Sequence, residues 1–177
     1  LPDFEFDGST RYDRSFDVVW HLADETRNTP AIAVGLRDLA GTGIYSSEYI
    51  VATRTLDPHW RISGGIGWGR LGSYNGFTNP LARIADGFAD RPKASEGGID
   101  TTGQVDFGVW FRGDAAVFGG VEWAPNDRFR LAVEYATDSY DLETRRGLTP
   151  RKSPINAALS YRFDNGFDLT ASYINGT

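Results

Sequence analysis

The chain has 177 residues and a formal net charge of −6, with 21 glycines, 14% aromatic residues and no cysteine. This length suits one domain, and the missing cysteines exclude disulfides and thiolate metal sites. The acidic balance and the lack of a basic patch argue against a nucleic-acid partner. No run of about 18 apolar residues exists, so no transmembrane helix is expected. The first residue is not Met and no signal-peptide pattern follows, which predicts a processed product or a fragment.

Segments in which apolar and polar residues alternate recur along the chain, and this period of two predicts β-strands. In the second segment, for example, Ile32, Val34 and Leu36 share one face, whereas Arg37 lies on the other. Turn signals rich in glycine, proline and aspartate follow several segments, at 41–43, 57–58, 125–127 and 164–166. Nine strands are predicted, at 15–22, 31–38, 45–54, 60–69, 104–112, 116–123, 129–136, 155–163 and 167–173.

Two long connections interrupt this rhythm, at 71–102 and 137–153. The first can form a short helix after Asn79, because Pro80 suits the first turn of a helix. With nine strands, the two connections would leave an up-and-down sheet from opposite sides, whereas outer-membrane barrels keep one side short. Either the strand count is wrong by one, or one of the loops folds against the barrel.

The pattern predicts an all-β fold, an antiparallel transmembrane β-barrel of about eight to ten strands that forms a single domain over residues 1–177. Because single-chain bacterial barrels have even strand numbers, nine strands favour a part of a larger barrel whose terminal strands need partners. The alternative is a soluble β-sandwich whose polar face lies in bulk water. Aromatic residues near the ends of the apolar faces fit the girdles of a barrel at the membrane interfaces, namely Trp60, Trp68, Trp123, Phe129, Tyr135, Phe163, Phe167 and Tyr173.

The opposite faces mix small residues with single charges, as the interior of a barrel does. The residues predicted to face the lumen and contact a ligand there are Arg37, Glu48, Arg61, Trp110, Glu122, Arg130, Glu134 and Arg162. Arg37 and Glu48 can also form a cross-strand pair that shapes a turn. The carboxylates of Glu122 and Glu134 suggest glycoside hydrolysis, but neutralisation by nearby arginines is the simpler interpretation. Trp110 is the best candidate for stacking on a sugar, because the other tryptophans considered lie on apolar faces.

An enzyme is not predicted from these residues. His21 shares a face with Asp17, which suggests a hydrolase relay, but the chain has no G-x-S-x-G serine motif. Two histidines and scattered acids do not form a metal site, and the 41–43 G-T-G sequence lacks the spacing of a phosphate loop. We therefore predict no catalytic, cofactor-binding or metal-binding residues.

Several segments resemble the YjbH/GfcD family of bacterial outer-membrane proteins from exopolysaccharide and capsule operons. The matching segments follow in order along nearly the whole chain: Y-D-R-S-F-D at 12–17, G-L-R-D-L-A-G-T-G-I-Y-S-S-E-Y-I-V-A-T-R at 35–54, G-W-G-R-L-G at 67–72, N-P-L at 79–81, F-G-G-V-E-W at 118–123, L-A-V-E-Y at 131–135, D-S-Y-D-L-E at 138–143 and S-P-I-N at 153–156. Members of this family are much longer, and the chain looks like their N-terminal part.

The resemblance implies a β-barrel in the outer membrane of a Gram-negative bacterium that supports export of exopolysaccharide or capsule, as a conduit or as a scaffold. The implied partners are outer-membrane lipid, the polysaccharide and other export proteins or the remainder of the barrel. Two alternatives stay open. One is a non-conducting structural barrel that docks partner proteins, and the other is an outer-membrane enzyme that acts on lipid or glycan. The family brings no catalytic motif, so no catalytic residue is transferred.

Overall fold

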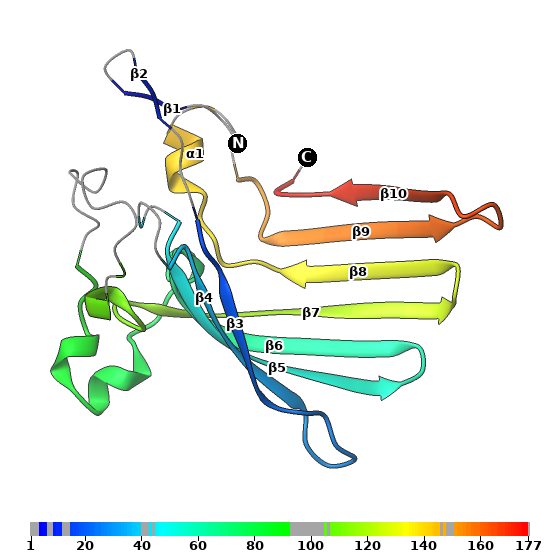
Figure 1. The fold of residues 1–177 in the computed structure, drawn as a ribbon, viewed down its shortest axis with the longest axis horizontal. Helices are drawn as coiled ribbons and strands as arrows, with labels where there is room; N and C mark the ends of the chain where they lie inside the picture. Colours follow the sequence, from blue (N-terminus) through cyan, green and yellow to red (C-terminus); the bar gives the residue numbers. More distant parts are fainter. Residues whose placement is uncertain are drawn as a thin grey trace.

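The computed structural model describes residues 4–6, 9–11, 15–39, 43, 45–92, 105, 107–145, 147 and 151–176. Its main feature is one antiparallel sheet of eight strands in the order β10-β9-β8-β7-β6-β5-β4-β3 (Figure 1). Each strand pairs with its neighbours in sequence, as an up-and-down meander does. The strands are β3 (Val18–Ala23), β4 (Ala31–Arg37), β5 (Ser47–Asp57), β6 (Trp60–Gly69), β7 (Ala115–Asn126), β8 (Phe129–Tyr135), β9 (Ile155–Arg162) and β10 (Asp168–Tyr173).

The short strands β1 (Phe4–Phe6) and β2 (Ser9–Arg11) form a separate two-stranded sheet. The helical elements all lie in the connections: the 3₁₀ helices η1 (Arg70–Gly72), η2 (Pro80–Arg83), η3 (Asp86–Phe88) and η4 (Phe107–Val109), and the α-helix α1 (Asp141–Arg145). The helix predicted after Asn79 is confirmed as η2, with Pro80 in its first turn and the Asn79 side chain accepting the Leu81 N–H. None of the helices in the described residues has the length and apolarity needed to cross a membrane.

The predicted strand at 104–112 is wrong. Of its residues, 105 and 107–112 are described, and they contain η4 and a turn in which Phe111 has a φ of 55°. The two phenylalanines of this segment have different partners. Phe111 lies edge-to-face on Trp68, with 5.2 Å between ring centroids, while Phe107 packs on Trp110.

Without a strand at 104–112, the two long connections leave the sheet from the same end, and the conflict found with nine strands disappears. The β4–β5, β6–β7 and β8–β9 connections all leave from one end of the sheet, which we call the loop end. The short β5–β6 and β7–β8 turns and the β9–β10 turn lie at the other, the turn end (right side of Figure 1). The alternative that the strand count was wrong by one is therefore confirmed.

Side chains explain the tight turns at the turn end. The Asp57 carboxylate accepts the backbone N–H groups of His59 and Trp60 at 2.7 and 3.0 Å. The Asn126 carbonyl accepts those of Arg128 and Phe129, both at 3.0 Å. Short polar side chains at the first turn position often hold a turn in this way. Both two-residue turns thus close through the same local interaction.

The sheet is open in the described part of the chain, because β3 and β10 each pair on one side only. The all-β antiparallel class is therefore confirmed. The predicted transmembrane barrel stays a prediction, because this sheet is not closed. All six residues of β3 and all six of β10 are exposed. The predicted need of the terminal strands for partners agrees with these two unpaired edges.

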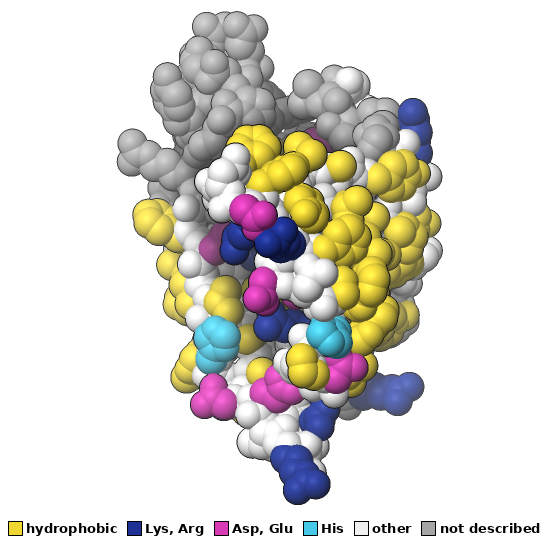
Figure 2. All heavy atoms as spheres, turned by 90° about the vertical axis from the view of Figure 1, so that its right-hand side faces the viewer, with side chains coloured by type: hydrophobic (Ala, Val, Ile, Leu, Met, Phe, Trp, Pro, Cys, Tyr) yellow, Lys and Arg dark blue, Asp and Glu magenta, His cyan; other side chains and the backbone are white. Residues whose placement is uncertain are grey.

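The two faces of the sheet differ strongly in chemistry. The face that we call convex exposes large apolar side chains on strand after strand: Val18, Trp20, Leu22, Ile50, Leu56, Trp60, Ile62, Val117, Ile155, Leu159, Tyr161, Leu169 and Tyr173. Figure 2, viewed from the right-hand side of Figure 1, shows hydrophobic side chains gathered along the flanks and charged and polar groups in the middle. Soluble sheets bury such a face against a second layer. Among the described residues, the few fully buried side chains gather instead at the loop end, where Trp68 and Ala115 are register partners.

Candidate functional site

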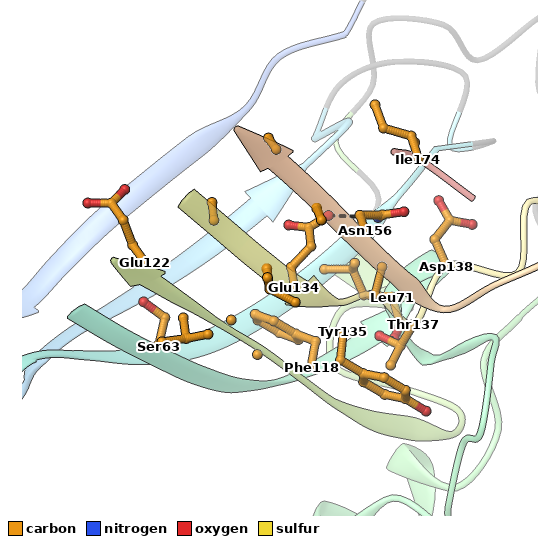
Figure 3. A pocket seen from close by; sticks show the side chains of 18 of the residues that line it. Ser63, Leu71, Phe118, Glu122, Glu134, Tyr135, Thr137, Asp138, Asn156 and Ile174 are labelled. Carbon is orange, nitrogen blue, oxygen red and sulfur yellow. Dashed lines mark hydrogen bonds between the residues drawn. The ribbon is translucent and has the colours of Figure 1, made fainter. Parts of the chain in front are cut away.

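The concave face of the sheet carries a trough with a volume of about 850 Å³. Side chains on alternate residues of β4 to β10 point into it, so the alternation of the strands positions them. The polar residues that line it include Arg37, Thr53, Arg61, Ser63, Glu122, Glu134, Asn156 and Ser172. Leu71, Thr137, Asp138 and Tyr140 line its loop end, and Figure 3 shows several of these groups around one hollow.

The trough is built in rows of register partners. One row runs Thr53, Ser63, Gly120, Glu134 and Asn156, and the next runs Arg61, Glu122, Ala132, Ala158 and Ser172. In the first row the Thr53 and Ser63 hydroxyls lie 2.8 Å apart, and the Asn156 amide donates to Glu134 at 2.8 Å. Glycine and alanine between the polar groups have small side chains and leave space above the sheet. The rows therefore present polar groups beside open space.

Most charges of the concave face are neutralised by nearby partners. Arg37 pairs with Asp17 at 3.7 Å, Arg130 pairs with Glu122 at 3.7 Å, and Arg162 contacts Asp168 at 2.9 Å. Glu122 is thus held by an arginine, and Glu134 by an amide. The predicted neutralisation by a nearby arginine is therefore seen for Glu122, whereas Glu134 has a hydrogen-bond partner without a charge. Among the described residues, no three acidic or histidine side chains meet in a way that could hold a metal ion.

Six of the eight predicted lumen residues lie on the concave face. Arg37, Arg61, Glu122 and Glu134 line the trough, and Arg130 and Arg162 continue the same face toward the turn end. Whether these side chains contact a ligand stays a prediction. Two of the eight are elsewhere. Trp110 follows η4 and packs against Phe107, with 4.7 Å between ring centroids, so it does not lie on a strand of the concave face.

Glu48 is the other exception, and the predicted pairing of Arg37 with Glu48 is wrong. Glu48 is a register partner of Trp68 on the convex face and is 1% exposed. Its carboxylate accepts hydrogen bonds from both terminal nitrogens of Arg91, at 2.7 and 2.9 Å, and from the backbone N–H of Phe111 at 2.9 Å. Glu48 therefore fastens the β6–β7 connection over the convex face instead of facing the trough.

The predicted interface aromatics fall into two groups. At the turn end, Trp60, Trp123 and Phe129 form a chain of ring contacts with centroids 5.9 and 5.7 Å apart. Phe163 continues the aromatic band between Tyr161 and Phe167, with centroids 4.9 and 5.8 Å away. Phe129 and Phe167 belong to the aromatics predicted from the sequence, whereas Tyr161 was not predicted as part of this band.

The loop-end members of the predicted girdle behave differently from one another. Tyr173 is exposed, whereas the Tyr135 hydroxyl accepts a hydrogen bond from the Asn75 side chain at 2.7 Å. Trp68 is 2% exposed because Phe111 of the β6–β7 connection packs against it, so its assignment as a membrane-interface residue is wrong. Packing by a distant segment replaces the predicted lipid contact at this position.

Arg70 joins the connections at the loop end. It contacts Asp138 and donates to Glu143 at 2.5 Å, and its guanidinium lies 4.8 Å from the Tyr45 ring centroid and 5.2 Å from that of Tyr140. Burial alone would lower the pKa of the Arg70 guanidinium, but its hydrogen bonds to the two carboxylates outweigh this and raise the pKa above its ordinary value. Arg70 therefore stays charged and holds three connections together beside the trough.

A family model described as exopolysaccharide biosynthesis protein YbjH matches residues 2–177. This chain belongs to the YjbH family. A relative from Escherichia coli (strain K12), named uncharacterized lipoprotein YjbH, is 34% identical over 173 residues, which cover 97% of this chain and 24% of the relative. The chain thus spans about a quarter of the length of that YjbH relative. No solved structure matched the chain.

Proposed function

We propose that this chain forms eight strands of an outer-membrane β-barrel that supports export of an exopolysaccharide, with the trough as part of its lumen. The single observation that carries the proposal is the contrast between the apolar convex face, exposed on strand after strand, and the polar concave face. A transmembrane barrel needs this distribution, because its outside faces lipid and its inside faces water. Connections that are long at one end only fit the same architecture.

Membership of an exopolysaccharide biosynthesis family supports the polymer as the ligand, and the lipoprotein name of the relative supports a place in the cell envelope. A conduit is favoured over a non-conducting scaffold by the open volume of about 850 Å³ on the concave face. Two described residues of the β6–β7 connection, Arg91 and Phe111, contact Glu48 and Trp68 on the convex face, while Leu71 lines the loop end of the trough. Water-filled space on the concave side would let a hydrated polymer pass with weak contacts at several points.

The unpaired edges of β3 and β10 support additional strands from the longer protein. Each unpaired backbone group costs several kcal/mol in hydrocarbon, so a membrane sheet has to close. In the full-length protein, cysteines at Val19 and Thr170, or at Val19 and Ser172, are expected not to form a disulfide within one molecule. The register partners Thr53 and Ser63, with hydroxyls 2.8 Å apart, provide the positive control as a cysteine pair. An intramolecular β3–β10 disulfide would show that the eight strands close on themselves.

Export through the trough can be tested by filling it. Ala132 and Ala158 are register partners on the concave face, and Val133 and Ala157 are register partners on the convex face beside them. We expect Ala132→Trp with Ala158→Trp to reduce the polymer in the medium while the protein stays in the outer membrane, because two indoles narrow the lumen. Val133→Trp with Ala157→Trp should leave export unchanged, since lipid accommodates the added rings. Equal export by both double variants would favour a scaffold.

A further inference from the structure

Two aromatic rings on the concave face lie over glycines of the neighbouring strand. The Tyr49 ring occupies the space that a β-carbon on its register partner Gly35 would need, with Cζ 2.1 Å from that position. Phe118 does the same over Gly65, with Cζ at 2.5 Å. Aromatic side chains cover cross-strand glycines favourably in sheets. Here the glycines also let the rings descend to the floor of the trough.

Phe118 is the ring that lines the trough, and Tyr49 supports it from the side. Their centroids are 6.1 Å apart and the ring planes meet at 87°, an edge-to-face contact. This edge-to-face contact holds the Phe118 ring in place. Phe118 was not predicted as a sugar contact, because its contacts with Gly65 and Tyr49 come from other strands and leave no local pattern in the sequence.

Polar groups line the same trough as the Phe118 ring. Gly120, two residues further along the strand, belongs to the row that also holds Ser63, Glu134 and Asn156. Asn156 is fixed from two sides, because its amide donates to Glu134 and its carbonyl accepts the Asn175 N–H at 2.8 Å. Figure 3 shows Phe118, Ser63, Glu134 and Asn156 around the same hollow. A ring, a hydroxyl, a carboxylate and an amide thus share one site.

The charges around this site disfavour a strongly anionic ligand. Arg130 is paired with Glu122, and Arg37 with Asp17. Among the described residues that line the trough, Arg61 and Glu134 are left without an ion-pair partner, and they have opposite signs. The site is therefore close to neutral and rich in hydrogen-bonding groups.

Building on the proposed function, we propose that Phe118, with Ser63, Glu134 and Asn156, forms a subsite for one or two sugar units of an uncharged polysaccharide. The C–H face of a pyranose packs on the Phe118 ring, and its hydroxyls donate to the Glu134 carboxylate and exchange hydrogen bonds with Ser63 and Asn156. One shallow subsite binds weakly, and weak binding lets the polymer dissociate and continue through the lumen. The subsite replaces Trp110 as the aromatic sugar contact.

The test is binding of maltohexaose, an uncharged oligosaccharide, to the full-length protein in detergent micelles, followed by ligand-observed NMR titration. Phe118→Ala should weaken binding roughly tenfold, the upper range of an aromatic contact. Phe118→Tyr should retain it, and Val117→Ala, on the opposite face of the same strand, should have no effect. Glu134→Ala should also weaken binding while the Phe118 ring stays in place. This variant tests the subsite if Phe118→Ala fails to fold.

Three results would overturn the subsite: no binding of maltohexaose by the parent protein, unchanged binding in both Phe118→Ala and Glu134→Ala, or preference for the acidic oligogalacturonate over maltohexaose. Outer-membrane location and polymer export are measured separately in cells. If the protein exports polymer but its maltohexaose binding does not depend on Phe118, the subsite is wrong and the proposed function stands. If binding depends on Phe118 but the protein lies outside the outer membrane, the subsite stands and the proposed function is wrong.

Discussion

Glu48→Ala is expected to destabilise the loop end of the full-length protein by about 3–5 kcal/mol, the cost of removing one partner of a buried ion pair. The substitution leaves the Arg91 guanidinium without its carboxylate and the Phe111 N–H without its acceptor. Both groups belong to the β6–β7 connection, so its attachment to the convex face should loosen. A lower melting temperature and faster limited proteolysis between β6 and β7 would report this loss.

The matched control is Arg128→Ala, which removes an exposed ion pair with Asp164 at the turn end. Exposed pairs contribute about 0–1 kcal/mol, so this variant should melt close to the parent. Glu48→Gln should lie between the two, because its carbonyl can still accept the Phe111 N–H but carries no charge for Arg91. If Glu48→Ala melts and is cleaved like Arg128→Ala, the connection is held by other contacts and Glu48 has no special role.

The residues of most strands predicted which face they present. Alternation placed Ile62, Val117 and Leu159 on one side and Ser63, Phe118 and Ala158 on the other, as found. This works because the period of a strand is two and one face is chemically uniform. Charge alone was a poorer guide on β5. Glu48 was assigned to the polar face, but it lies beside Trp68 on the apolar face, where a partner 43 residues away neutralises it.

Long-range contacts explain the other differences from the sequence-based predictions. The alternation at 104–112 is as regular as in a true strand, yet Phe111 takes a positive φ and packs on Trp68. The position of the Phe118 ring depends on Gly65 and Tyr49, which lie on two other strands and meet Phe118 only through the strand register. Local pattern thus predicted most strands and their faces, whereas the loop end and the aromatic subsite depend on tertiary contacts that no local pattern contains.

Leu159→Arg is expected to reduce assembly into the outer membrane, because Leu159 lies near the middle of β9 on the exposed convex face. If this face contacts lipid, an arginine near the bilayer midplane costs about 2–4 kcal/mol. If the face instead lies in water, the same substitution replaces an exposed leucine with a charge and should change stability by less than about 0.5 kcal/mol. The two environments therefore predict clearly different results for one substitution.

Ala158→Arg is the matched control, since Ala158 is the adjacent residue and lines the trough. An arginine in a water-filled trough should be tolerated, so the amount of heat-modifiable protein in the outer-membrane fraction should fall for Leu159→Arg and stay near the parent level for Ala158→Arg. The reverse order would mean that the faces are assigned the wrong way round. Equal amounts of both variants at the parent level would place the convex face in water or against protein, and the contrast between the faces would no longer support a membrane barrel.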